Sequence, residues 1–210
     1  MSAKNFFQIG RKIVAIGRNF SEHAKELGNE VPTAPFFFFK PTSSFVKSPG
    51  NIEIPKGSVV HHEVELGVVI GKTGRDINEQ NAFQHVAGYV LALDMTARNI
   101  QDIAKQKGLP WSQAKGYDTF TPIGEFIPKE MVPDPHKVRL WAKVAGKIKQ
   151  DGSTEQMIFH SITTLEVGDI LLTGTPKGVG PIEPGQNIVA GMEYDGTELA
   201  RITFDAISRN

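Results

Sequence analysis

The sequence contains no cysteine. This absence excludes a disulfide scaffold, a zinc site with thiolate ligands and nucleophilic catalysis by a cysteine. Any metal ion must therefore be held by carboxylates, histidines or carbonyl groups.

Net charge and long apolar runs are also missing. The 210 residues include 23 basic and 23 acidic side chains, a balance that argues against a nucleic-acid binder, which would carry a basic face or tail. No run approaches the roughly 18 apolar residues that a membrane span needs. We therefore expect neither a nucleic acid nor a membrane as a partner.

Acidic side chains are absent from the start of the chain, where Glu22 is the first and basic residues precede it. A basic start without acids is compatible with the remnant of a mitochondrial presequence. Residues 13–16 nevertheless have the pattern of a first strand, so this segment alone leaves targeting open.

Turn-forming residues are abundant, with 21 Gly and 13 Pro scattered along the chain. Such scatter favours many short strands joined by turns. The apolar run 35–40 is expected to be buried on both faces, and 41–55 to be irregular. Strands are predicted at 12–17, 35–40, 59–70, 87–93, 138–144, 147–150, 169–173, 188–192 and 199–204, and helices at 19–27 and 99–107. The sequence therefore predicts a β-rich mixed α/β fold in one domain, residues 1–210.

The most informative segment is 61–67, which carries two glutamates. On a strand Glu63 and Glu65 share a face and lie about 7 Å apart. Two like charges beside apolar neighbours are unfavourable unless a cation or a proton compensates them. Asp94 ends another apolar strand, where a loop begins. Three carboxylates without cysteine suit Mg²⁺, with Mn²⁺ or Ca²⁺ as substitutes.

The Glu-x-Glu spacing alone also fits the solvated face of a half-buried strand. His61 and His62 are adjacent and point to opposite faces, so they cannot join the same ligand set. We expect each of them to be a structural histidine.

His23 and Glu26 form an i, i+3 pair on the predicted helix 19–27. A carboxylate beside an imidazole fixes its tautomer and raises its basicity, which suits a general base. The same spacing also fits an ordinary surface pair.

Lys115 and the glycine-rich segment 174–180 are further candidates. A lysine near a metal can pair with a substrate carboxylate or stabilise an enolate oxygen, although a solvated lysine is the alternative. The segment 174–180 could present backbone N–H groups and the Thr175 hydroxyl to an anion. The segment 174–180 is not a phosphate-binding P-loop, because no Gly-Lys-Ser/Thr closes it. The segment 71–73 does not complete a P-loop either, because Leu66 stands where the first Gly of the motif is required. We therefore set nucleotide binding aside.

Several short motifs occur together in a characteristic order. They are Gly17-Arg-Asn-Phe20 with His23, Phe39-Lys-Pro41, His62-Glu-Val-Glu-Leu-Gly67, Asp94-Met-Thr-Ala-Arg98 with Gln101-Asp102, Gly108-Leu-Pro-Trp111 with Lys115, and Gly168-Asp169 before Gly174-Thr-Pro-Lys-Gly-Val-Gly180. Over nearly the whole chain the sequence resembles the fumarylacetoacetate hydrolase family, in its short, single-domain branch of acylpyruvases and oxaloacetate-processing enzymes.

The resemblance implies a β-roll fold with a few short helices, a homodimer and one Mg²⁺ or Mn²⁺. Residues up to about 50 would supply a strand, a helix that covers the site and a connecting segment. By the family pattern Glu63, Glu65 and Asp94 are the metal ligands, which overturns the solvated-face alternative. The remaining matches are the catalytic residues His23, Glu26 and Lys115 and the substrate-binding residues Arg18, Gln101 and Thr175.

The resemblance also implies an Mg²⁺-dependent enzyme that acts on oxaloacetate and related 2-oxo acids through a metal-stabilised enolate. That intermediate serves keto–enol tautomerisation, decarboxylation or, as the alternative, hydrolysis of acylpyruvates to pyruvate and a carboxylic acid. A catalytically inactive metal-binding homologue is the alternative from another class. Eukaryotic members imply a mitochondrial location and bacterial ones a cytoplasmic location.

One departure from the family pattern lies at 160–163, where relatives have a short helical insert. We interpret it either as a true deletion or as a segment that the given sequence omits.

Overall fold

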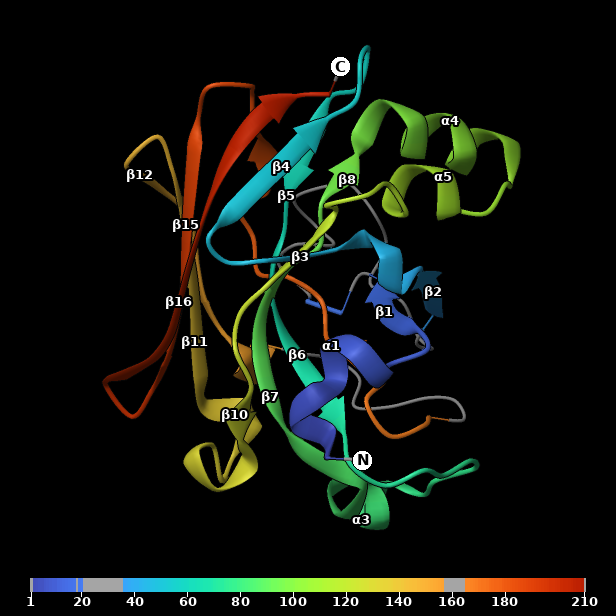
Figure 1. Cartoon of the computed structure of the whole chain (residues 1–210), viewed down its shortest axis with the longest axis vertical. Helices are drawn as coiled ribbons and strands as arrows, with labels where there is room; N and C mark the ends of the chain where they lie inside the picture. The colour runs from blue at the N-terminus through green and yellow to red at the C-terminus, as the bar shows by residue number, and fades with distance from the viewer. Residues whose placement is uncertain (1, 18, 21–35, 157–164, 210) are drawn as a thin grey trace.

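The computed structural model describes residues 2–17, 19–20, 36–156 and 165–209. The predicted helix at 19–27 and the link at 160–163 lie outside these residues, apart from Asn19 and Phe20. In the described part, strands dominate and helices are short (Figure 1). The β-rich mixed α/β prediction is therefore confirmed.

Three sheets organise the described part of the chain. The eight-stranded sheet has the order β2-β1-β13-β6-β7-β9-β3, with β10 paired to β7, and the five-stranded sheet has the order β12-β11-β15-β16-β4. A small third sheet has the order β14-β5-β8. Their strands are β1 (Ile13–Gly17), β2 (Phe36–Lys40), β3 (Phe45–Lys47), β4 (Gly50–Ile54), β5 (Val60–His62), β6 (Val64–Ile70), β7 (Val86–Leu93), β8 (Thr96–Ala97), β9 (Thr121–Ile123), β10 (Ile127–Pro128), β11 (Val138–Val144), β12 (Lys147–Ser153), β13 (Ile170–Leu172), β14 (Gly180–Pro181), β15 (Asn187–Tyr194) and β16 (Thr197–Ser208).

The described helices lie outside the sheets. They are α1 (Phe6–Ile9), α3 (Glu79–Ala82), α4 (Arg98–Lys107) and α5 (Ser112–Lys115), with 3₁₀ turns at Ala3–Asn5, Thr42–Ser44, Phe83–His85, Lys129–Met131, Pro135–Lys137 and Thr154–Gln156. Helix α4 ends at Gly108, whose left-handed backbone accommodates the stop without a Cβ clash. None of the helices in the described segments is long and apolar enough to cross a membrane.

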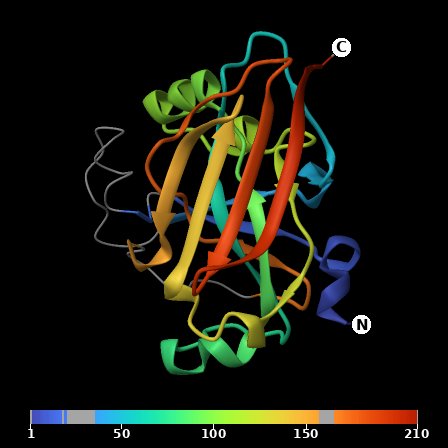
Figure 2. The same ribbon diagram turned by 90° about the vertical axis from the view of Figure 1, so that its left-hand side faces the viewer.

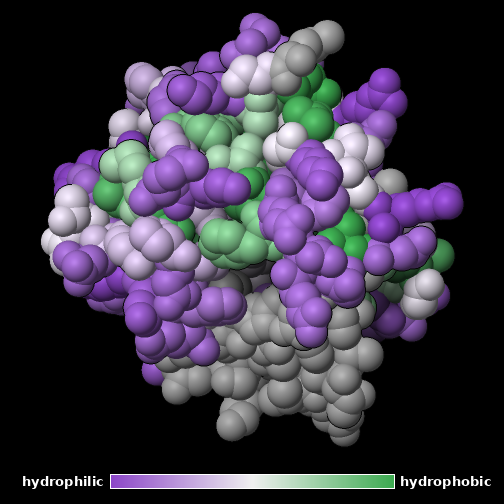
Figure 3. Space-filling view, turned by 90° about the horizontal axis from the view of Figure 1, so that it is seen from below, coloured by the Kyte–Doolittle hydropathy of each residue, from purple (hydrophilic) through white to green (hydrophobic). Residues whose placement is uncertain are grey.

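The five-stranded sheet forms one broad layer, and Figure 2 shows it face on. Its inner side chains, such as Leu140 and Met192, join Val64, Leu66 and Leu93 of the larger sheet in one buried cluster. The opposite face of β6 and β7 belongs to a second cluster, which Phe6 of α1 helps to cover. The central strands are therefore buried on both faces. At the end of the molecule seen in Figure 3, polar side chains predominate and apolar ones show between them.

Three local predictions differ from the structure. Strand β2 is an edge strand with alternating exposure, and Phe37 and Phe39 are 38% and 48% exposed, so burial on both faces is wrong. The segment 41–55, predicted to be irregular, contains β3 and β4, whose partners come from β9 and β16 far along the chain. The predicted strand 59–70 is two strands, β5 and β6, interrupted at Glu63.

Candidate metal centre and active-site pocket

Three carboxylates meet where the pair β6–β7 ends. Glu63 lies between β5 and β6, Glu65 lies on β6, and Asp94 directly follows β7. The antiparallel register pairs Glu65 with Ala92, and the Asp94 N–H donates to the Glu63 carbonyl oxygen at 2.8 Å. One carboxylate oxygen from each residue lies within 4.8 Å of the others, and all three side chains are buried. Strand pairing thus brings together the acidic residues singled out from the sequence.

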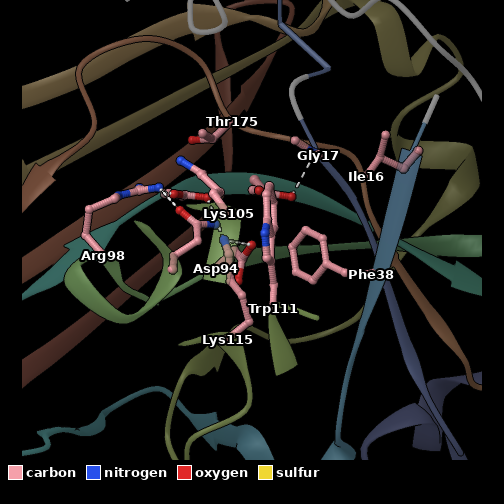
Figure 4. Close-up of a pocket in the computed structure, with 13 residues that line it drawn as sticks. Ile16, Gly17, Phe38, Asp94, Arg98, Lys105, Trp111, Lys115 and Thr175 are labelled. Atoms are coloured by element: carbon pink, nitrogen blue, oxygen red, sulfur yellow. Dashed lines mark hydrogen bonds and ion pairs between the residues drawn. The ribbon is translucent and has the colours of Figure 1, made fainter. Parts of the chain in front are cut away.

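Three cations surround this acidic triad. The Lys115 ammonium donates to Glu63 at 2.9 Å and to Asp94 at 2.5 Å (Figure 4). Lys40 donates to Asp94 and, at 2.7 Å, to the Phe120 carbonyl oxygen. Arg98 donates to Glu63 from the start of α4. These contacts explain how the fold buries three carboxylates, because unpaired buried charges are costly.

Sequence reasoning assigned no role to Lys40 or Arg98. Lys40 did carry a signal, since a lysine that ends a run of four phenylalanines is poorly explained without a buried acidic partner. The sequence indicated a site role for Arg98 less clearly, because an arginine at the start of a helix can have many different partners. Its contact with Glu63 depends on how β8 directs α4 towards β5 and is therefore a tertiary effect.

Glu65 is the carboxylate with the least compensation. Burial, together with the nearby Asp94 and Glu63, raises the pKa of Glu65 well above its usual range. Lys115 opposes that rise, and so does the Gly174 N–H, which donates to Glu65 at 2.8 Å. Among the described residues Glu65 forms no ion pair, in contrast to its two neighbours.

The two lysines respond differently to their surroundings. Burial lowers the pKa of Lys40, although Asp94 works in the opposite direction. Burial also disfavours the charged form of Lys115, but Asp94 and Glu63 outweigh it and raise the pKa of that ammonium. Lys115 is therefore a firmly held positive charge at the triad.

The donor set fits a divalent cation. Three buried carboxylates that approach one another this closely offer hard oxygen ligands, which suit Mg²⁺, Mn²⁺ and Ca²⁺. Burial beside Asp94 and Glu63 raises the pKa of Glu65, so among the described residues it is the triad carboxylate whose ionised form is least stabilised. A divalent cation bound by all three carboxylates would place positive charge beside Glu65, which forms no ion pair with a described residue.

A pocket opens onto the triad (Figure 4). Gln101 lies in its wall and accepts a hydrogen bond from Arg98 at 2.5 Å. Thr175 also lines the pocket, where its hydroxyl donates to the Val64 carbonyl oxygen at 2.8 Å. Further lining residues are Ile16, Gly17, Phe38, Lys105, Trp111 and Gly174. The structure thus places the predicted residues Lys115, Gln101 and Thr175 around the triad.

The glycine-rich segment has a role that its sequence did not indicate. The Gly174 N–H, predicted as a donor for an anion, is aimed at the buried Glu65. Gly174 has φ +94°, and an added Cβ would lie 2.9 Å from the Asn19 Cβ, so another side chain would be strained and crowded here. The segment therefore helps to hold one carboxylate of the triad.

His62 and Gln150 form a buried network beside the pocket. Gln150 Oε1 accepts from the Val64 N–H at 3.0 Å and lies 2.9 Å from His62 Nδ1, while its Nε2 donates to Thr175 at 2.8 Å. Sequence reasoning missed Gln150, since a single glutamine on a hairpin strand carries no distinctive pattern. Gln150 holds His62 through Nδ1, whereas His62 Nε2 is buried and has no hydrogen-bond partner among the described residues, so the role of a satisfied structural histidine stays a prediction.

The proposed catalytic pair and one substrate contact fall outside the described residues. They are His23, Glu26 and Arg18. Their roles remain predictions.

Comparisons with known proteins agree with this architecture. The sequence profile described as fumarylacetoacetate (FAA) hydrolase C-terminal matches residues 12–203. The chain is 56% identical to "Oxaloacetate decarboxylase, mitochondrial" of Dictyostelium discoideum, over 97% of each protein. It is 50% identical to "Oxaloacetate tautomerase FAHD1, mitochondrial" of Arabidopsis thaliana, over 98% of this chain and 95% of the relative.

A solved structure that contains a metal ion is also similar in fold. The fumarylpyruvate hydrolase from Pseudomonas aeruginosa, in complex with Mn²⁺ and pyruvate, superposes with a TM-score of 0.85 at 31% identity. The match covers 95% of this chain and 91% of that one. Fold, profile and relatives therefore agree, and the chain belongs to the fumarylacetoacetate hydrolase family.

Proposed function

We propose that the protein is an Mg²⁺-dependent enzyme that converts oxaloacetate and related 2-oxo acids through an enolate, by keto–enol tautomerisation, decarboxylation or both. The observation that carries this proposal is the buried triad of Glu63, Glu65 and Asp94 at the base of a pocket lined by cations. The oxaloacetate activities named for relatives at 56% and 50% identity support the choice of substrate.

The pocket combines the charges that such chemistry needs. When bound at the triad, a divalent cation would polarise the 2-oxo acid and stabilise the negative charge that develops on its oxygen. Lys115 holds a fixed positive charge beside the same carboxylates and would strengthen that stabilisation. Gln101 and Thr175 would position the substrate from two sides of the pocket, and Phe38 and Trp111 would limit water.

Proton transfer is assigned to His23, with Glu26 to orient its imidazole and Arg18 to contact the substrate. A positioned histidine contributes about 10² to 10⁴ in rate as a general base. The assignment is supported by the family motif in which these residues occur.

Hydrolysis of acylpyruvates is the second candidate. It is favoured by the superposition on a fumarylpyruvate hydrolase crystallised with pyruvate. Both reactions develop negative charge on the oxygen of the 2-oxo group, so the acidic triad alone does not separate them.

We also propose that residues 1–210 form one catalytic domain, that the protein is a homodimer and that it works in mitochondria. The last point is supported by relatives whose names place them there. Light scattering coupled to size-exclusion chromatography measures the oligomeric state directly.

Proton NMR of the purified protein with Mg²⁺ tests the activity. Supplied with enol-oxaloacetate, a tautomerase accelerates formation of the keto form, whereas a decarboxylase produces pyruvate. Supplied with acetylpyruvate, a hydrolase releases acetate and pyruvate. We expect oxaloacetate turnover that EDTA abolishes and that His23→Ala slows by about 10² or more.

Two controls make the test decisive. Mg²⁺ without protein measures the spontaneous reaction, and Glu65→Gln, which lacks one proposed ligand, measures turnover without a complete triad. Full activity in EDTA would contradict the metal requirement, and unchanged rates in His23→Ala would contradict the assigned base.

A further inference from the structure

Helix α4 presents a row of polar side chains to the pocket. Arg98, Gln101 and Lys105 all line it, and their i, i+3, i+7 spacing places them on one face of the helix. Figure 4 shows Lys105 at the same pocket, with its end directed towards the side where Thr175 lies. One helix thus supplies the pocket with two cations and an amide.

Lys105 differs from the other lining cations in its ion-pair partner. Arg98 and Lys115 bind carboxylates of the buried triad. Lys105 instead pairs with Asp102 at 3.3 Å, one helical turn away, and Asp102 has a side chain that is 53% exposed. An ion pair at such an exposed position contributes little to stability, so a ligand can displace it at low cost.

The surroundings of Lys105 favour an anion at the pocket wall. Its side chain is only 28% exposed, and its ammonium lies 5.8 Å from the centre of the Trp111 ring. Trp111 is itself held by Phe36 and Phe38 of β2, with ring centres 5.2 and 5.4 Å away. This aromatic wall reduces the local solvent, which strengthens an ionic contact made there.

We propose that Lys105 is a specificity-determining residue that binds the distal carboxylate of a dianionic 2-oxo acid. The inference rests on the proposed function, because it takes the triad end of the pocket as the place of the 2-oxo acid group. A substrate with a second carboxylate gains a charge-assisted hydrogen bond from Lys105. A substrate with an uncharged acyl end gains none. Lys105 therefore selects oxaloacetate over acylpyruvates.

Steady-state kinetics with two substrates tests this selection. In Lys105→Met we expect kcat/KM for oxaloacetate to fall about tenfold, mainly through KM, which corresponds to the loss of one hydrogen bond to a charged group. The value for acetylpyruvate should change less than about twofold. Lys105→Arg should recover most of the oxaloacetate value because it restores the charge.

Lys107→Met is the matched control. It removes an exposed lysine from the same helix that does not line the pocket, so both kcat/KM values should stay unchanged. An equal loss for both substrates in Lys105→Met would assign Lys105 a structural role and overturn the proposal. Unchanged kinetics for both would overturn it as well.

Calorimetric binding separates this inference from the proposed function. Difluoro-oxaloacetate, a dianion that cannot enolise, and 2-oxobutyrate, a monoanion, are titrated into the Mg²⁺-loaded protein and into Lys105→Met. We expect the substitution to weaken the dianion about tenfold and to leave the monoanion unchanged. That result supports the role of Lys105 even if the protein turns over neither substrate. A lack of turnover would refute only the proposed function. Equal weakening of both ligands, or of neither, would refute the role of Lys105.

Discussion

Replacing Glu65 by glutamine should make the metal-free protein more stable while it removes metal binding. The substitution keeps the shape of the side chain and an oxygen that can accept the Gly174 N–H bond, but it removes the charge. Glu65 is buried, has a raised pKa and forms no ion pair with a described residue. The ionised form of Glu65 therefore lowers the free energy of unfolding of the metal-free protein.

The size of the effect follows from the separation of the carboxylates. Two unit charges 4.8 Å apart at an effective dielectric constant of about 20 repel by about 3.5 kcal/mol. Two neighbours repel Glu65, but the attraction of Lys115 and the bond from Gly174 offset much of this. We expect a net gain of about 2 kcal/mol in the free energy of unfolding, or about 4–8 °C in Tm for a chain of this length.

The pH dependence has a definite sign. The folded-state pKa of Glu65 lies above its unfolded value, so the stability contributed by its protonated form is present at acid pH and lost as the pH rises through the folded pKa. The advantage of Glu65→Gln should therefore be largest near pH 8 and shrink towards zero at acid pH.

Thermal unfolding in EDTA and in Mg²⁺ is the assay. In EDTA at pH 8 the variant should melt above the unsubstituted protein. In Mg²⁺ the order should reverse, because a ligand at 100 times its Kd adds about 2.7 kcal/mol to the protein that binds it.

Two comparison variants show whether the reasoning is correct. Glu183→Gln removes an exposed charge and should leave both melting curves unchanged. Glu63→Gln weakens the contacts to Arg98 and Lys115 and should lower Tm in EDTA, opposite to Glu65→Gln. A lower Tm for Glu65→Gln in EDTA at pH 8 would refute the claim that the charge of Glu65 destabilises the metal-free protein.

Two further predictions concern buried positions. Gln150→Leu leaves the Val64 N–H, His62 and Thr175 without their partner, so urea unfolding should show a loss of about 2–4 kcal/mol; a loss below about 1 kcal/mol would contradict the importance of this network. Gly191→Ala would place a Cβ 2.2 Å from the Trp141 ring across β11 and β15, so it should cost about 1–3 kcal/mol in the same assay and shift the Trp141 fluorescence. An unchanged midpoint and spectrum would show that the ring moves aside freely.

Much of the fold was predictable because it rests on local patterns. The strands predicted at 138–144 and 147–150 are separated by only two residues and pair as β11 and β12, and the structure gives Ala145 and Gly146 the positive φ that a tight turn requires. The helical spacing before Gly108 predicted α4 to within one residue. In both cases neighbours in sequence determine the conformation.

The wrong secondary-structure predictions concern segments whose conformation depends on strands far away in the sequence. Strands β3 and β4 look irregular in sequence, because their regularity comes from pairing with β9 and β16. The four phenylalanines of β2 suggest a central strand, but no sequence pattern reveals that β2 lies at the sheet edge with one face open. Position within a sheet is a property of the assembled fold.

The candidate site divides in the same way. The sequence by itself determined which atoms could hold a metal, because it lacks thiolates and supplies three carboxylates in a family motif. Only the tertiary structure decided how the triad is compensated: it places Lys40, Lys115 and Arg98 around the triad, and none of the described cations forms an ion pair with Glu65. The physical reason is that residue type sets which bonds a side chain can form, whereas burial and distance set the strength of those bonds. Burial and distance are fixed only when strands and helices that are far apart in sequence pack together.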